Sequence, residues 1–297
     1  MPPAFALYDI YDREIVIDLP LLLDEVDGLG MPSVVHLVQA GAMQDGETYL
    51  MSRLRRRTVT MNFNIVADSE DQCWEASEQL LRLAAQLTHG FRLRVTLPNG
   101  SKRDCHLRYA ASMTMPRSVR DAHATQNAVM QCISLDNPTL YNPDQKRAVL
   151  RAGSGVGNSH FPLSFPVGFE GSSLDDSYLV RYPGSWRTYP TIELTGPLTD
   201  PAIYNLSAGT KLEMVTGYAL DAGEVITFDL TPGIKRVTHS VDGDIAHFLT
   251  KDSDLSAWCL APDPDVINGD NNIQVSGTNV GLNTLVEFRY YERFIGI

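Results

Sequence analysis

After Arg57, residues 58–65 alternate strictly between polar and apolar side chains. In an extended chain the apolar positions fall on one face, while threonine and asparagine occupy the other. An alternation of period two is typical of a strand with one buried face. The sequence therefore predicts a strand here, and its buried side chains are Val59, Met61, Phe63 and Ile65.

An amphipathic helix is predicted directly after this strand. Ser69 and Gln72 have the spacing of a capping box, which satisfies backbone N–H groups at the start of a helix. Apolar residues then recur at helical spacing as far as Leu87, and Gly90 is a typical stop. We expect one helix, over about residues 69–89, that packs on the strand.

A hairpin and one further strand complete the first predicted domain. Residues 91–97 alternate again, Asn99-Gly100 supplies turn residues, and a return strand continues to Tyr109. An apolar run over residues 127–135 ends at Asp136-Asn137-Pro138, where proline closes the element. We expect the first domain to span residues 1–142.

The composition changes over residues 143–182, where glycine, serine, proline and aromatic residues dominate. This composition disfavours regular structure, yet the phenylalanines of residues 161–169 need burial against another surface. We interpret residues 143–182 as an extended arm.

Short strand-like runs separated by turn residues make up residues 183–297. No apolar period of helical length occurs there. The spacing is typical of an antiparallel β-sandwich, and the sequence as a whole predicts a mainly β protein with one packed helix. The runs are 191–194, 211–215, 225–229, 272–275 and 285–291.

Charge and composition exclude several classes of protein. The formal net charge is −12, whereas nucleic-acid binders cluster cations against phosphates. The most apolar stretch, residues 15–23, is too short to span a bilayer, and the first residues lack the basic segment of a signal peptide. The four scattered cysteines suit buried thiols in a reducing cytoplasm. We therefore expect neither a membrane segment nor direct binding of nucleic acid.

No motif indicates a cofactor, a metal or catalysis. Gly153, Gly155 and Gly157 lack the lysine of a phosphate loop. The run from Asp263 to Asp270 resembles a calcium loop, but Ile267 and Asn268 occupy positions that need a ligand and a glycine, so a solvated turn is favoured. The histidines never pair at metal-ligand spacing, and no nucleophile elbow occurs. We expect no enzymatic activity.

Two groups of residues are candidates for binding. Arg53, Arg55 and Arg57 share one face if the strand extends upstream, and with acidic surface abundant elsewhere they indicate a charge-paired subunit interface. Trp186 and Trp258 could stack on a sugar, although aromatic residues in a sandwich more often pack in the core or in an interface.

The order of short motifs along the whole chain resembles that of the distal tail proteins (Dit) of long-tailed bacteriophages. The motifs of the first domain are Gly28-Leu29-Gly30 with Pro32, Asp45-Gly46, the strand led by Arg57, the helix from Trp74 to Leu87, Asn99-Gly100, and Leu135 to Pro138. Those that follow are Phe161 to Phe169, Trp186 to Pro190, Thr195-Gly196-Pro197, Pro201 with Ile203 and Asn205, Gly223-Glu224, Asp229, and Asn271-Asn272-Ile273.

Two turns depart from the family pattern. Residues 181–184 read Arg-Tyr-Pro-Gly where many members have Asn-x-Gly, and a usually compact turn is expanded to Pro262 through Asn271. Both departures concern local geometry rather than the fold.

The resemblance implies a split-barrel-like ring domain with a helix, followed by a galectin-like sandwich. It implies a hexameric ring in the virion, at the tail tip, assembled in the host cytoplasm. The ring would contact the tail tube protein, the tail-associated hub protein and the tape measure protein, and could anchor a receptor-binding protein. DNA would only pass through the lumen, where acidic charge would keep it from being retained.

Two other functions stay open at this stage. A carbohydrate-binding module would contact host cell-wall sugars directly through residues 181–297. A wall-degrading hydrolase would need a catalytic carboxylate pair, for which the many acidic residues offer no specific candidate.

Overall fold

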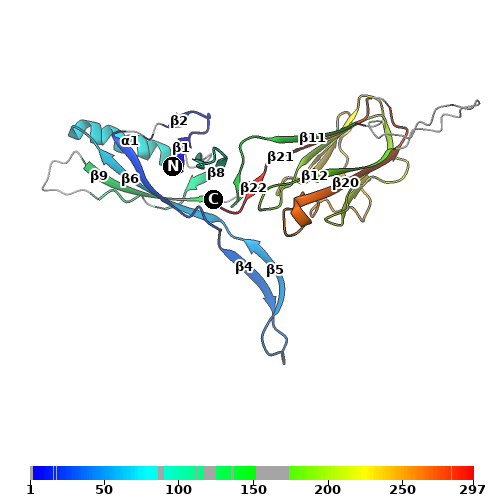
Figure 1. The fold of residues 1–297 in the computed structure, drawn as a ribbon, viewed down its shortest axis with the longest axis horizontal. Helices are drawn as coiled ribbons and strands as arrows, with labels where there is room; N and C mark the ends of the chain where they lie inside the picture. Colours follow the sequence, from blue (N-terminus) through cyan, green and yellow to red (C-terminus); the bar gives the residue numbers. More distant parts are fainter. Residues whose placement is uncertain are drawn as a thin grey trace, which may run out of the picture. The chain divides into compact units, whose positions relative to one another are not determined.

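The computed structural model describes residues 3–15, 17, 19–85, 90–111, 113–116, 125–134, 137–151, 174–281 and 283–297. Within these ranges the chain is mostly strand, with one α-helix and two short 3-10 helices (Figure 1). The prediction of a mainly β fold with one helix is confirmed. The chain divides into two compact units: unit 1 comprises Met1–Pro143 and Phe294–Ile297, and unit 2 comprises Asp144–Arg293.

Unit 1 contains an antiparallel sheet with the strand order β2–β1–β7–β8–β9–β6–β3. The described strands form an open path that ends at β2 and β3, so they do not close into a barrel. The bounds are β1 (Ala4–Tyr8), β2 (Glu14–Ile15), β3 (Leu21–Asp27), β6 (Arg57–Val66), β7 (Phe91–Thr96), β8 (Lys102–Tyr109) and β9 (Thr125–Ser134). The short strand β10 (Leu140–Tyr141) pairs with β8 and with β22 (Arg293–Phe294).

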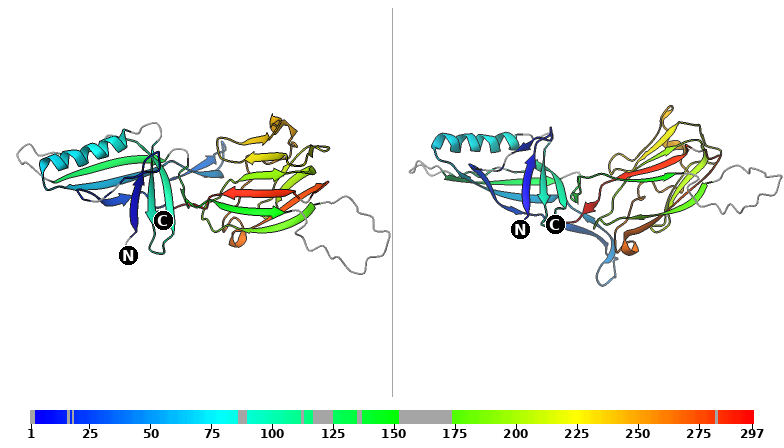
Figure 2. Two further views of the ribbon diagram at one scale, coloured as in Figure 1. Left: turned by 90° about the horizontal axis from the view of Figure 1, so that it is seen from above. Right: turned by 45° about the horizontal axis from the view of Figure 1, so that its top comes forward.

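Helix α1 (Glu70–Ala84) covers one face of this sheet (Figure 2). The Ser69 hydroxyl accepts a hydrogen bond from the Gln72 backbone N–H at 3.3 Å, as the predicted capping box requires. The Gln72 side chain accepts from the backbone N–H of Asp68 rather than from that of Ser69. Residues 86–89, at the end of the predicted helix, lie outside the described residues.

The core of unit 1 lies between α1 and the sheet. The predicted inward side chains of β6 are all buried, and Cys73, Ala76 and Leu80 of α1 belong to the same cluster. The outward face of β6 is polar, as its alternation predicts. The hairpin β7–β8 turns at Gly100, whose φ of 83° is in the region that favours glycine.

Unit 2 is a sandwich of two antiparallel sheets that share one core. One sheet has the order β11–β21–β13–β17–β18–β19, with bounds β11 (Lys146–Arg151), β21 (Leu285–Tyr290), β13 (Thr191–Thr195), β17 (Val225–Asp229), β18 (Arg236–His239) and β19 (Gly243–Asp244). The other has the order β12–β20–β14–β15 with β16 beside β14, and its bounds are β12 (Leu174–Arg181), β20 (Asp270–Thr278), β14 (Leu198–Asn205), β15 (Thr210–Glu213) and β16 (Ala219–Leu220). The predicted antiparallel sandwich is therefore present.

A buried pair of asparagines joins β14 to the turn before β20. The Asn205 Nδ2 donates to Asn271 Oδ1 at 3.0 Å, and Asn271 Nδ2 donates to the carbonyl oxygens of Ala261 and Gly269. The expanded turn of residues 262–271 contains the 3-10 helix η2 (Ile267–Gly269), and the other 3-10 helix is η1 (Ala246–Phe248). In this turn Asp263 accepts a hydrogen bond from the Asn268 N–H, as expected of a side chain that shapes a turn.

The stretch predicted as an extended arm contains two strands of the sandwich, β11 and β12. Residues 152–173, which include the glycines at 153, 155 and 157 and the phenylalanines of 161–169, lie outside the described residues. The predicted division at residues 142 and 182 stays a prediction.

Candidate assembly surface

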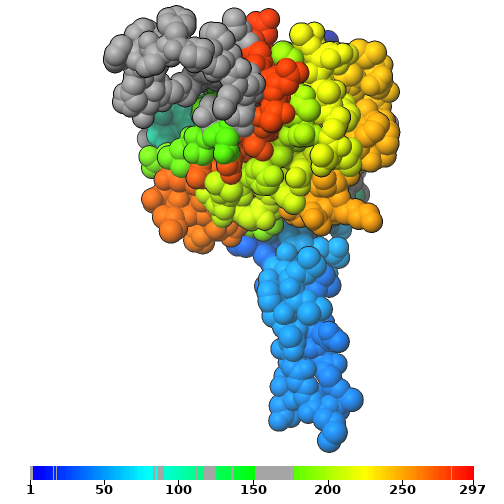
Figure 3. Space-filling model, turned by 90° about the vertical axis from the view of Figure 1, so that its right-hand side faces the viewer, coloured from blue at the N-terminus to red at the C-terminus, as the bar shows by residue number. Residues whose placement is uncertain are grey.

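A β-hairpin of unit 1 protrudes from the sheet and pairs only with itself among the described strands. Strand β4 (Val34–Gln39) pairs with β5 (Thr48–Leu54) in a separate two-stranded sheet, which we call the protruding hairpin (residues 34–54). In Figure 3 it is the blue column. A two-stranded hairpin is at best marginally stable alone in water, so this one is expected to gain stability from a partner.

The protruding hairpin exposes an unusual number of large apolar side chains. Tyr49 is 60% exposed and Met51 is 54% exposed, while Met43 at the tip has no cover at all. Leu37, Val38 and Leu50 are exposed as well. Large apolar side chains exposed on both faces of a hairpin favour a role in protein–protein contact.

The two faces of the protruding hairpin differ in chemistry. Leu37 lies opposite Met51, and Val35 lies opposite Arg53, so these four residues share one face, which is apolar with a basic residue at its base. On the other face His36 and Tyr49 both hydrogen-bond the Ser52 hydroxyl, at 2.6 and 2.9 Å. That face also carries apolar side chains, at Val34, Val38 and Leu54. We call the first the apolar face, because it presents side chains without internal polar partners.

The base of the protruding hairpin is held by a buried arginine. Arg57 begins β6, is 1% exposed, and directs its guanidinium at four backbone carbonyls. It donates to the carbonyl oxygens of Gly28 and Gly30 before β4, at 2.8 and 2.6 Å. It also donates to Pro138 and to Ile295, both at 2.7 Å. Burial lowers the pKa of this guanidinium, yet an arginine keeps its charge, and the charge makes these hydrogen bonds strong.

Arg57 therefore does not belong to an exposed basic face. The prediction that Arg57 shares a surface with Arg53 and Arg55 is wrong, because the Arg57 side chain is buried inside unit 1 and its guanidinium donates to backbone carbonyls there. Arg53 and Arg55 are exposed beside the base of the hairpin, and neither forms an ion pair in the part of the chain that the structure describes. The predicted charge-paired interface rests on these two residues and stays a prediction.

The C-terminal residues close the same base. The backbone N–H of Ile297 donates to the Leu29 carbonyl at 3.2 Å, and Gly296 lies so close to Gly30 that an added Cβ would stand 3.1 Å from the Gly30 carbonyl carbon. The Arg103 guanidinium lies 3.3 Å from the centre of the Phe294 ring. Unit 1 is thus completed by residues that follow all of unit 2 in the chain.

The two tryptophans proposed for sugar stacking have different environments. Trp258 is 0% exposed and lies parallel to the Phe288 ring in the core of unit 2, with ring centres 6.1 Å apart. Its indole cannot present a face to a sugar in this structure. Trp186 is half-buried, with the Arg187 guanidinium 5.4 Å from its ring centre. The predicted sugar contact could therefore involve Trp186 only, and it stays a prediction.

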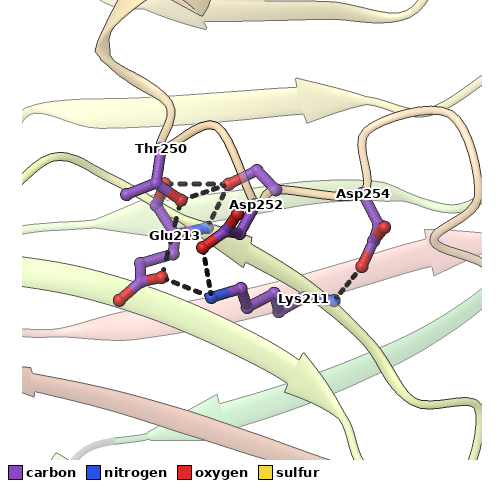
Figure 4. A network of polar contacts seen from close by, with 6 residues as sticks. Lys211, Glu213, Thr250, Asp252 and Asp254 are labelled. Carbon is purple, nitrogen blue, oxygen red and sulfur yellow. Dashed lines mark hydrogen bonds and ion pairs between the residues drawn. The ribbon is translucent and has the colours of Figure 1, made fainter.

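A network of charged residues in unit 2 centres on Lys211. The Lys211 ammonium lies 3.0 Å from Glu213 Oε2 and 3.9 Å from Asp252 Oδ2, while Asp254 accepts from the Lys211 N–H (Figure 4). The lysine offsets part of this negative charge, and the contacts connect β15 to the loop of residues 250–254, so we interpret the network as structural. Among the described residues, no group of three or more His, Cys, Asp or Glu side chains is placed to hold a metal ion. Nor does the described chain contain a helix that is long and apolar enough to cross a membrane.

The protruding hairpin was not predicted from the sequence. A signal was present, since Asp45-Gly46 separates two runs rich in apolar and β-branched residues, but neither run alternates between a buried and an exposed face.

Comparison with solved structures shows that this fold is similar to that of a phage tail protein. The Dit (gp 19.1) protein of phage SPP1, described as a paradigm of the hub adsorption apparatus in phages that infect Gram-positive hosts, aligns with a TM-score of 0.61 and 14% identity over 98% of this chain and 99% of that chain. Two structures of the phage p2 baseplate in its activated conformation align over 100% of both chains, each with a TM-score of 0.45. The identity is 8% for the structure with Sr and 9% for the structure with Ca.

No protein-family model matches the sequence, and no curated protein does either. The SPP1 structure supports, along nearly the whole chain, the mainly β fold with one helix that the resemblance to distal tail proteins implies. The galectin-like character of the sandwich stays a prediction.

Proposed function

We propose that this chain is a structural subunit of a phage tail that assembles with copies of itself into a hexameric ring at the distal end of the tail tube. The ring connects the tube to the tail-tip or baseplate hub and to the apparatus that recognises the host. The fold shared with the SPP1 hub protein supports this role. The observation that carries the self-assembly is the protruding hairpin, whose exposed apolar side chains require cover that unit 1 does not supply.

Passage of DNA through such a ring is supported by the chemistry of the uncovered sheet face. On the side away from α1, β6 presents Thr58, Thr60, Asn62 and Asn64, and the neighbouring strand β3 presents Glu25 and Asp27. Strand β9 adds Asn127 and Gln131. Strands β3, β6 and β9 thus place polar and acidic side chains on this face, while Arg108 of β8, opposite Ile133 of β9, adds a cation beside them. The polar and acidic part suits a channel wall past which DNA slides.

The test is the mass of the purified full chain by light scattering after size exclusion, with negative-stain images of the same fraction. The proposal predicts closed rings of uniform diameter with the mass of a hexamer. A monomer at every concentration would contradict self-assembly. A binding module that acts alone would then be the better account, and a panel of cell-wall glycans would test it.

A further inference from the structure

Unit 1 has a groove at the far end of β6 from the protruding hairpin. Its volume is about 520 Å³, and it is lined by the end of β6, by the chain before β3 and by the outer side of α1. The apolar lining comes from Leu19, Pro20, Val66 and Ala76, and the polar lining comes from Asp68, Gln72, Glu75 and Gln79.

The groove and the apolar face of the hairpin are complementary in chemistry. The groove combines exposed apolar surface at Leu19 and Val66 with two carboxylates, Asp68 and Glu75. The apolar face of the hairpin combines Leu37 and Met51 with the guanidinium of Arg53. Within the described residues, Arg53, Asp68 and Glu75 form no ion pair, so charges of opposite sign remain available on the two surfaces.

The hairpin of a given copy does not reach its own groove. Strand β6 has 10 residues and separates Arg57 at the hairpin base from Val66 in the groove, a span of about 30 Å. The hairpin also leaves the sheet on the side away from α1 (Figures 1 and 2). A hairpin that occupies this groove must therefore come from a second copy of the chain.

We infer that the apolar face of the protruding hairpin of one copy docks in the α1–β6 groove of the next copy. Leu37 and Met51 cover Leu19 and Val66, and Arg53 lies against Glu75 and Asp68. The contact joins two different surfaces, so it is head-to-tail, and repetition of a head-to-tail contact gives a ring when the rotation closes. The inference rests on the proposed self-assembly and adds to it the two surfaces that meet.

Cross-linking between copies tests the contact. One copy carries Met51→Cys and a second, differently tagged copy carries Gln79→Cys, and the coexpressed rings are treated with a short bismaleimide. The native cysteines are buried and do not compete. A covalent dimer that carries both tags is expected. The matched control replaces Gln79→Cys by Thr60→Cys, on the uncovered sheet face, and should give no dimer. Rings that form without the Met51–Gln79 product would overturn this inference and leave the ring itself standing, whereas the absence of any ring would contradict both.

Charge reversal gives an independent measurement. Arg53→Glu and Glu75→Arg should each weaken assembly about fivefold, the effect of losing one exposed ion pair, and the double variant should recover most of the loss. If the double variant assembles as weakly as the two single effects multiplied together predict, the two residues do not contact each other. Arg56→Glu, an exposed neighbour outside the proposed contact, should not be rescued by Glu75→Arg.

Discussion

The guanidinium of Arg57 donates a hydrogen bond of 2.7 Å to the carbonyl oxygen of Ile295, a residue 238 positions later in the chain. The same guanidinium holds Gly28 and Gly30, from which the chain enters the protruding hairpin. One side chain thus ties the segment that leads into the hairpin to Ile295, which follows all of unit 2 in the chain. Its removal would leave four carbonyl oxygens without their donor.

Arg57→Leu is expected to destabilise unit 1 by about 3 kcal/mol or more, because buried acceptors lose a charged partner. Chemical denaturation followed by circular dichroism measures the change. Arg56→Leu, at an exposed arginine next to Arg57 and outside the proposed contact between copies, should change the free energy of unfolding by less than about 0.5 kcal/mol. Equal effects of the two substitutions would contradict the role assigned to Arg57.

Deletion of residues 294–297 should loosen the hairpin base although it removes no residue of the hairpin. The deletion takes away the Ile295 acceptor, the Ile297 N–H donor to Leu29 and the Phe294 ring beneath Arg103. Hydrogen exchange should become faster over residues 28–30 and 57–59, with little change in the core strand β13. Unchanged exchange at residues 28–30 would show that the C-terminal residues do not hold the base.

Gly28→Ala is expected to be much more damaging than Gly46→Ala. Both glycines have positive φ, 90° and 81°, so each substitution introduces strain of about 1–2 kcal/mol. Only at Gly28 would the new Cβ also stand 2.0 Å from the Thr58 carbonyl oxygen. Thermal unfolding of the two variants compares them directly, and similar melting temperatures would argue against a tight hairpin base.

The strand β6 and helix α1 could be predicted because each has one buried face, which leaves a regular period in the sequence. The protruding hairpin has no buried face, so its strands carry no such period. The role of Arg57 could not be predicted either, because its four acceptors come from three distant parts of the chain. Similarly, sequence alone did not distinguish the core residue Trp258 from the half-buried Trp186, since only tertiary packing separates them.

Asn271→Ala should destabilise unit 2 by about 2–3 kcal/mol, because it removes the acceptor of the Asn205 amide and of the Ala261 N–H and the donor to the Ala261 and Gly269 carbonyls, all of them buried. The neighbouring substitution Asn272→Ala is the control and should have a small effect, since Asn272 is only half-buried. Denaturant unfolding measures both, monitored by the fluorescence of Trp258 in chains that also carry Trp74→Phe and Trp186→Phe. A small effect at Asn271 would contradict the structural importance of the asparagine pair.

The buried thiols should resist alkylation in the native protein. Burial raises the pKa of Cys105 to about 11 and that of Cys132 to about 12, so the reactive thiolate is scarce at pH 8. Because folding favours the neutral thiol, this contribution to stability is fully present below the ordinary thiol pKa of 9.0 and is lost as the pH rises through 11. Mass spectrometry after iodoacetamide treatment at pH 8 should show unmodified protein, and complete modification in denaturant. Rapid native modification of Cys105 or Cys132 would contradict their burial.

The most direct test of the account compares the mass of the assembled wild type with that of a variant whose protruding hairpin has lost its apolar face. Leu37→Ser with Met51→Ser removes exposed side chains that have no role in the core of unit 1. The account predicts rings for the wild type, monomers for the variant, and the same circular dichroism spectrum for both. Rings of unchanged mass in the variant, or a wild type that stays monomeric, would contradict the claim that this hairpin drives assembly.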